Sequence, residues 1–175
     1  LGFANDDAAG RRFADPSASW SVPETLRDSL MARLDLAPRG RTVAQMAAVV
    51  GREFSYDLLR GVSSLDDTEL EASLAGLEEH EIVRRIDARR PVRYAFRHAL
   101  LRDSAYESLL KSSRRRIHGK VAAVIERDSP DIVANRPELL AYHYSQAGNS
   151  EFAVRYWLEG GERARSRSAN LEAIG

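Results

Sequence analysis

A β-hairpin is predicted by the stretch Ile82-Val83-Arg84-Arg85-Ile86-Asp87-Ala88-Arg89-Arg90-Pro91-Val92-Arg93-Tyr94-Ala95-Phe96. Its two ends, residues 82–86 and 92–96, are rich in β-branched and aromatic side chains, and the second alternates as a half-buried strand does. The five residues between them, 87–91, favour a turn. The stretch therefore predicts two antiparallel strands in the middle of the chain.

Helical periodicity surrounds this hairpin. Before it, four helices are predicted from the stripes Leu26/Leu30/Leu34, Val43/Met46/Ala47/Val50, Phe54/Leu58/Leu59 and Leu70/Leu74/Leu77. Pro38 and Gly40 are expected to separate the first two, and Gly51 to cap the second. After the hairpin, two more helices are predicted from Leu101/Ala105/Leu109 and Ile117/Val121/Val124. We therefore expect a mainly α fold in which a winged-helix-like domain contains one β-hairpin.

The last part of the chain carries another pattern. Its apolar and small residues are Leu140, Ala141, Tyr144, Ala153, Trp157 and Gly160. Their spacing resembles a tetratricopeptide repeat, whose period is about 34 residues, and Ile174 and Gly175 fit a second repeat. In this interpretation small residues let two antiparallel helices approach, and Tyr144 and Trp157 fill the space between them. An ordinary helical hairpin is the alternative.

Composition limits the classes of protein that the chain can belong to. Its 26 Lys and Arg balance 26 Asp and Glu, so net charge alone predicts neither nucleic-acid nor membrane binding. Cys is absent, which excludes disulfides and thiolate sites. No apolar run approaches the roughly 20 residues of a membrane span, and the first residues do not form a signal peptide.

The predicted domain organisation has three parts. Residues 1–22 lack an apolar period and are expected to be a leader or linker, and residues 23–128 form the winged-helix-like domain. A break at Asp128-Ser129-Pro130-Asp131 precedes residues 129–175, the start of truncated tetratricopeptide-like repeats. Because the chain starts at Leu1 and ends in a helical pattern, we expect it to be a piece of a larger protein.

Catalytic motifs are missing from the sequence. There is no G-x-x-x-x-G-K-[ST], no G-x-S-x-G and no H-E-x-x-H. None of the four histidines, His80, His98, His118 and His143, is spaced i, i+4 from another, so a metal site is not expected. The sequence predicts no catalytic residue, no metal and no cofactor within the chain itself.

Charge is distributed unevenly along the chain. Residues 82–120 contain twelve Lys and Arg against three acids, whereas residues 63–81 contain seven acids and no Lys or Arg. The candidate basic surface comprises Arg84, Arg85, Arg89, Arg90, Arg93, Arg97, Arg114, Arg115, Arg116 and Lys120. It predicts either a polyanion surface, such as duplex DNA under a wing, or internal pairing of basic with acidic faces. We favour pairing, because the helix predicted at Asp66–Glu81, which occupies the recognition position, is acidic and repels a DNA groove.

His98 is the remaining candidate for a functional side chain. It lies where the second strand of the hairpin ends and the next helix begins. The helix dipole disfavours an imidazolium at a helix N-terminus. A neutral imidazole there can form one hydrogen bond or contact a phosphate, and the alternative is a half-buried histidine with a structural role.

Three segments together resemble a known family. They are Val22-Pro23-Glu24-Thr25-Leu26-Arg27-Asp28, Ala47-Ala48-Val49-Val50-Gly51-Arg52-Glu53-Phe54 and Phe96-Arg97-His98-Ala99-Leu100-Leu101-Arg102-Asp103-Ser104-Ala105-Tyr106-Glu107. At this spacing they are similar to bacterial signal-transduction ATPases with numerous domains, of the kind fused to class III adenylate/guanylate cyclases. In that family a P-loop domain precedes a winged helix and tetratricopeptide repeats. Related switch ATPases carry a Met-His-Asp-Leu motif after the winged-helix hairpin, and its His contacts the phosphates of bound ADP in the closed state. Here Arg97-His98-Ala99-Leu100 keeps the His and the Leu but has Ala99 in place of Asp.

The resemblance implies a function for the parent protein rather than for this segment. The segment would be a non-catalytic regulatory module that couples nucleotide state to a protein or small-molecule effector on helical repeats. His98 would sense the nucleotide phosphates. ATP or ADP with Mg would bind the parent, which would carry an adenylate cyclase. The implied partners are the upstream P-loop domain and downstream repeats, in the cytoplasm and without a membrane. The alternatives are a DNA-binding module of an ATPase-type transcription regulator and a plain interaction scaffold.

Overall fold

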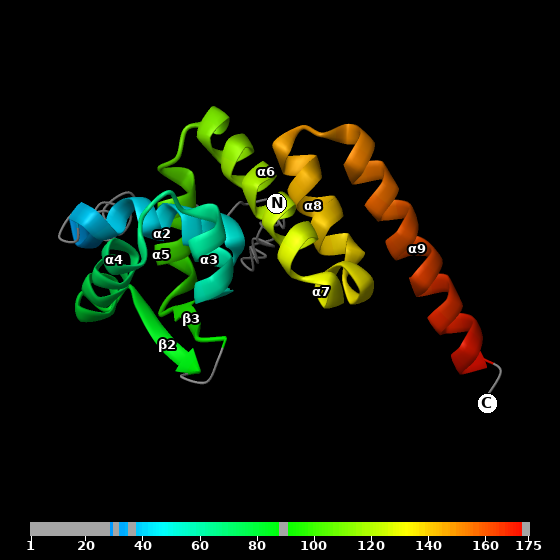
Figure 1. The fold of residues 1–175 in the computed structure, drawn as a ribbon, viewed down its shortest axis with the longest axis horizontal. Helices are drawn as coiled ribbons and strands as arrows, with labels where there is room; N and C mark the ends of the chain where they lie inside the picture. Colours follow the sequence, from blue (N-terminus) through cyan, green and yellow to red (C-terminus); the bar gives the residue numbers. More distant parts are fainter. Residues whose placement is uncertain (1–28, 30–31, 35–37, 88–90, 173–175) are drawn as a thin grey trace, which may run out of the picture.

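The computed structural model describes Ser29 and residues 32–34, 38–87 and 91–172, and it is mainly helical (Figure 1). The first half consists of α2 (Pro38–Val50), β1 (Glu53–Ser55), α3 (Tyr56–Val62), α4 (Asp67–Glu79), β2 (Val83–Asp87) and β3 (Arg93–Phe96). The second half consists of α5 (Ala99–Glu107), α6 (Lys111–Asp128), α7 (Pro130–Asn135), α8 (Pro137–Ala147) and α9 (Ser150–Glu172).

The first half has the element order of a winged helix. The three strands form an antiparallel sheet in the order β1-β3-β2, so the predicted hairpin is confirmed. The third strand, β1, was not predicted, and Phe54 lies on it rather than on a short helix. Three residues are too few to show an alternating pattern. Phe54 nevertheless fixes the strand, because it is paired with Tyr94 and their rings stack with centroids 5.7 Å apart.

Local signals explain where several helices begin and end. Asp66 caps α4, and it forms a capping box with Glu69, which satisfies free N–H groups of the first turn. Gly51 follows the end of α2, as predicted. Helix α2 begins at Pro38, where a missing N–H costs nothing, so Gly40 lies inside α2 and does not separate two helices. Of the helix predicted from Leu26, Leu30 and Leu34, only Ser29 and residues 32–34 are described, and they are helical.

Helix α6 connects the two halves of the chain. It packs against α2 and α3 on the winged-helix-like side and against α7 and α8 on the other. In Figure 1 it runs between the two halves, and α9 lies beyond α8. The approach of α3 to α6 is close, because a Cβ added at Gly61 would lie 2.7 Å from Cγ1 of Val124. The predicted domain boundary coincides with the end of α6 at Asp128.

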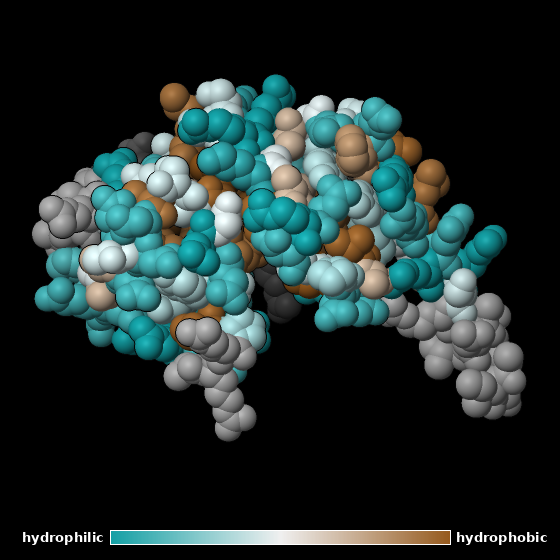
Figure 2. All heavy atoms as spheres, in the orientation of Figure 1, coloured by the Kyte–Doolittle hydropathy of each residue, from teal (hydrophilic) through white to brown (hydrophobic). Residues whose placement is uncertain are grey.

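A single hydrophobic core continues across this boundary. It runs from α2 through Leu77 of α4 and Ile125 of α6 to Leu140 of α8 and Tyr156 of α9, each at most 2% exposed. The predicted leader, residues 1–22, and the second-repeat positions Ile174 and Gly175 lie outside the described residues. The face drawn in Figure 2 is mostly hydrophilic, and apolar side chains are exposed on the first half of α9.

Candidate functional site at the junction of α6 and α8

A chain of three polar side chains crosses the junction between the two halves. His118 of α6 and His143 of α8 place their Nδ1 atoms 2.9 Å apart. The other nitrogen of His118, Nε2, lies 3.1 Å from the hydroxyl of Tyr106 on α5. Both histidines are 1% exposed. The contacts therefore join three helices inside the protein, and we call these residues the histidine junction.

The histidine junction is neutral at neutral pH. Burial, together with the positive charges of Arg102 and Arg114, lowers the pKa of His118 to about 4. Burial likewise lowers the pKa of His143 to about 4, with a smaller contribution from His118. A neutral imidazole carries one N–H, so one Nδ1 donates and the other accepts. Protonating both rings would leave two donors facing each other without an acceptor.

A second polar cluster joins α6 to α8 and α9, the two helices of the helical hairpin. The carboxylate of Glu126 accepts hydrogen bonds from the hydroxyls of Tyr144 on α8 at 2.5 Å and Tyr156 on α9 at 2.6 Å. The two tyrosine rings stack with centroids 5.8 Å apart and an angle of 3° between their planes. Short hydrogen bonds to a carboxylate are stronger than those between neutral groups. Glu126 therefore fixes α8 and α9 against α6.

The same bonds change the ionisation of all three groups. Hydrogen bonds from Tyr144 and Tyr156 lower the pKa of Glu126, although burial opposes them. Burial, together with the hydrogen bond to Glu126, raises the pKa of Tyr156 to about 12. The pKa of Tyr144 is raised by the same two causes. The cluster is thus a carboxylate with two protonated phenols over a wide range of pH.

The substitution Glu126→Gln should weaken this cluster without changing its shape. A neutral amide accepts through one oxygen only, so we expect the free energy of unfolding to fall by about 1–2 kcal/mol. The tyrosines should also begin to ionise at a lower pH, since both phenols lose the carboxylate. Urea unfolding and an absorbance titration of tyrosine measure the two effects. Glu162→Gln, on the exposed surface of α9, is the matched control, and equal behaviour of the two variants would contradict this account.

His98 lies outside both clusters. It is the N-cap residue of α5, its side chain makes no capping hydrogen bond, and it is exposed. The structural alternative of a half-buried histidine is therefore wrong. An exposed imidazole at this position is available to a group from outside the described part of the chain.

The basic residues do not form one surface. Those of the hairpin lie at one end of the winged-helix-like half, and the first turn of α6 lies at the other (Figure 1). On and beside the hairpin, Arg85 pairs with Glu78 at 3.6 Å and Arg97 with Glu81 at 4.0 Å, so basic and acidic segments pair as we favoured. Arg84 and Arg93 are exposed, and Arg93 bonds to Glu53 at 2.8 Å. Arg89 and Arg90 lie outside the described residues.

On α6 the basic residues have different surroundings. The guanidinium of Arg114 lies over the ring of Tyr106, 4.7 Å from its centroid, and donates to the backbone carbonyls of Leu109 and Glu107. Arg115, Arg116 and Lys120 are exposed. Arg114 therefore has a structural role beside the histidine junction.

The residues that were predicted to pack α8 against α9 lie between these two helices as expected, except for Trp157. Leu140, Ala141, Tyr144 and Ala153 are buried, and a Cβ at Gly160 would lie 3.7 Å from the backbone nitrogen of Glu138. Trp157 does not fill the space between the helices, because it is 50% exposed and donates from its edge to Ser145 at 3.2 Å. Tyr156, one residue earlier, fills that space and is 2% exposed.

The junction residues were missed by the sequence analysis. His118 and His143 are 25 positions apart, and Glu126 and Tyr156 are 30 apart. Neither pair has a spacing that signals contact. Within the ranges that the structure describes, no group of three or more His, Asp or Glu side chains could hold a metal ion. Among the described helices none is long and apolar enough to cross a membrane.

Comparison with known proteins finds a similar sequence in a bacterium. An uncharacterized protein of Rhizobium meliloti (strain 1021) is 28% identical over 158 residues. The match covers 90% of this chain and 15% of that protein. No protein-family model matches the chain, and no solved structure matches it significantly. The chain is thus similar to a small part of a much longer protein.

Proposed function

We propose that the chain is a non-catalytic regulatory module between domains of a multidomain signalling ATPase. The histidine junction and the Glu126 cluster carry this proposal, because they attach α8 and α9 to α6 by buried or half-buried polar contacts. Those contacts supplement a hydrophobic core that is shared by both halves. A displacement of the winged-helix-like half would therefore move the helical hairpin with it.

The proposed coupling runs between domains that flank this module. ADP on an upstream P-loop domain would hold the module closed through His98, and an effector on downstream helical repeats would favour an open state. The phosphates would belong to ATP or ADP, which would bind with Mg to the P-loop domain and not to this chain. The exposed imidazole of His98, free of any capping bond, fits contact with such a phosphate. The output would pass to an adenylate or guanylate cyclase in the cytoplasm.

DNA binding is the less favoured function. The exposed residues of α4, the helix in the recognition position, include Asp67, Glu69, Glu71 and Glu79. Like charge repels this face from phosphate. Strongly salt-dependent binding of the chain to duplex DNA would reverse this preference.

The variant His98→Ala in the parent protein tests the proposed function. We expect ADP release to accelerate about ten-fold, equivalent to the roughly 1.4 kcal/mol of one charge-assisted hydrogen bond to phosphate. Release of a fluorescent ADP analogue measures the effect. His80→Ala, at the C-terminus of α4, is a control that changes another histidine of the same half. Equal ADP release from the wild type and the His98 variant would remove this role.

A further inference from the structure

A cavity of about 640 Å³ lies where the two halves of the chain meet, and we call it the junction cavity. Its apolar lining comes from β1, α3, α6, α7 and α8 and includes Phe54, Leu58, Val124, Ile125, Ile132 and Leu139. The first, third and fourth of these side chains are buried, and the others are half-buried. A mostly apolar cavity between two structural units, with few polar groups, is typical of a small-molecule site.

One polar side chain that lines the junction cavity is buried. His143 is only 1% exposed, and its Nδ1 faces His118. Its other ring nitrogen, Nε2, makes no hydrogen bond to any residue that the structure describes. Every fully buried side-chain nitrogen or oxygen of the described residues has a hydrogen-bond partner. Nε2 is therefore not fully enclosed, and it opens into the cavity that His143 lines.

The direction of the hydrogen bonds in the histidine junction decides what His143 offers there. The imidazole nitrogen of His118 is more basic than the hydroxyl oxygen of Tyr106, so the hydroxyl donates and Nε2 of His118 accepts. The proton of neutral His118 is then on Nδ1, which donates to Nδ1 of His143. His143 therefore keeps its own proton on Nε2 and presents an N–H donor to the junction cavity.

The described charged side chains at the rim of the junction cavity do not select an anion. Arg93 pairs with Glu53 at 2.8 Å, and Arg136 lies 3.6 Å from Glu138. The carboxylate of Asp128 also lines the rim. Because each of these arginines faces an acid, a neutral acceptor complements the N–H donor of His143 better than an anion does.

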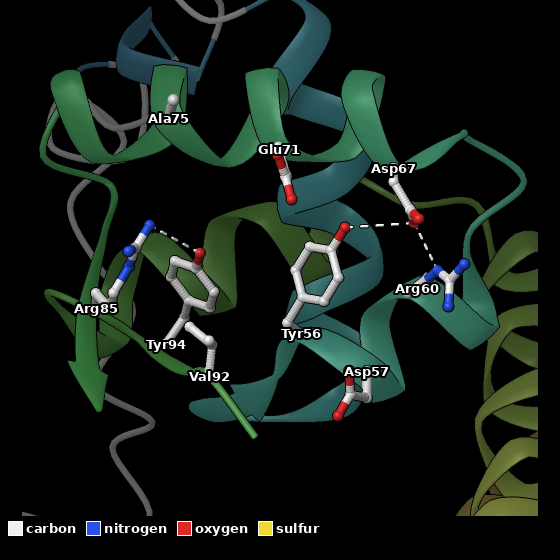
Figure 3. A pocket seen from close by; sticks show the side chains of 9 residues that line it. All are labelled: Tyr56, Asp57, Arg60, Asp67, Glu71, Ala75, Arg85, Val92 and Tyr94. Carbon is white, nitrogen blue, oxygen red and sulfur yellow. Dashed lines mark hydrogen bonds and ion pairs between the residues drawn. The ribbon is translucent and has the colours of Figure 1, made fainter. Parts of the chain in front are cut away.

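A cavity between α3, α4 and the hairpin lacks such a donor among the described residues that line it (Figure 3). The hydroxyl of its buried tyrosine, Tyr94, already accepts a hydrogen bond from Arg85 at 3.3 Å. The side chains of Arg60 and Tyr56 both bond to Asp67. The free N–H group of His143 therefore distinguishes the junction cavity from this one.

We propose that the junction cavity binds a small neutral molecule with an apolar body and a carbonyl oxygen, and that this oxygen accepts a hydrogen bond from Nε2 of His143. The apolar body lies against the half-buried side chains of Leu58, Ile132 and Leu139. Such a ligand touches α3 on one side and α7 and α8 on the other, so its binding stabilises the arrangement of the two halves. The site is separate from His98 and does not rest on nucleotide sensing.

Nuclear magnetic resonance of isotope-labelled histidine rings in the full chain tests the donor directly. We expect the proton of His118 on Nδ1 and that of His143 on Nε2, since each ring nitrogen has a distinct signal in its protonated and bare forms. A proton on Nδ1 of His143 would leave an acceptor instead of a donor in the junction cavity, and it would overturn the proposal.

Titration of the full chain with acetophenone tests binding, and ethylbenzene, in which a methylene replaces the carbonyl, is the matched probe. With acetophenone we expect saturable shifts of residues that line the junction cavity and of the Nε2 proton of His143. Loss of the hydrogen bond should weaken the binding of ethylbenzene about ten-fold. Equal affinity of the two probes, or no saturation at about 10 mM acetophenone, would contradict the proposed site.

A pair of leucine variants tests the location of the site. Leu139 of α8 lines the junction cavity, whereas Leu158 of α9 is 63% exposed and lies outside it. Leu139→Trp fills part of the cavity and should weaken the binding of acetophenone at least about ten-fold, and Leu158→Trp should change it less than about two-fold. Circular dichroism checks that both variants fold. Unchanged affinity in the folded Leu139 variant would place the probe elsewhere and reject the junction cavity as its site.

Discussion

Lowering the pH from about 7 to about 5 should cost the folded chain about 2 kcal/mol for each of His118 and His143. In the unfolded chain these histidines take up protons as the pH falls below their ordinary pKa of 6.5. In the folded chain the pKa of each is about 4, so they stay neutral through most of this range. Acidification therefore stabilises the unfolded state relative to the folded state, and the free energy of unfolding falls.

The pH range in which the free energy of unfolding falls identifies the histidines as the cause. Their contribution is present above pH 6.5 and is lost as the pH falls toward the folded value of about 4. The pKa of Glu126 lies below its ordinary value of 4.5, so its contribution is lost only at still lower pH. A loss of stability between about pH 6.5 and 5 can therefore be assigned to the histidine junction.

Urea unfolding at several pH values measures this loss, and the ring signals of the histidines report each pKa directly. His98→Asn, which alters an exposed histidine, is the control variant for both measurements. An unfolding midpoint that is the same at pH 7 and pH 5, or ring signals of His118 and His143 that titrate near 6.5, would contradict the buried neutral pair.

Leu140→Ala should destabilise the entire described chain and not the helical hairpin alone. Leu140 of α8 is fully buried in the core that both halves share. Truncating a buried leucine removes apolar burial and leaves a cavity, at a cost of about 2–5 kcal/mol. Because α6 joins the halves, we expect a single cooperative transition with a lower urea midpoint.

Leu158→Ala is the matched control for this prediction. It makes the same substitution on α9, where Leu158 is 63% exposed, and should cost less than about 0.5 kcal/mol. Circular dichroism and the fluorescence of the two tryptophans, Trp20 and Trp157, follow the unfolding by two probes. Two separate transitions in the Leu140 variant, with the winged-helix-like half unaffected, would show that the halves are independent.

Local patterns were sufficient to predict most helices and the hairpin. The stripe of Leu70, Leu74 and Leu77 is buried as expected, since helical spacing places them on one face of α4. Strand β1 escaped because its only buried side chain is Phe54, and its pairing with β3 depends on residues about 40 positions away. Contacts between distant segments leave no local periodicity.

The same reason explains which residues of the candidate site could be predicted from the sequence and which could not. The sequence analysis singled out His98, which lies exposed at the N-cap of α5, and its role stays a prediction. It missed His118 and His143, because each looks like an isolated histidine until α6 and α8 are packed together. Tyr156 and Trp157 show that the spacing of residues in one helix does not decide which of two neighbouring aromatic rings is buried. One residue corresponds to about 100° of rotation, which decides which ring faces α8.

Native-state hydrogen exchange of the full chain tests most directly whether the two halves form one coupled unit. Exchange is followed residue by residue at neutral pH with increasing denaturant. We predict that core amides of β3, α6 and α8 exchange with a common free energy, equal to that of global unfolding. If the amides of α8 and α9 open at a clearly lower free energy while β3 stays protected, the halves are independent. The proposed transmission through α6 would then be contradicted.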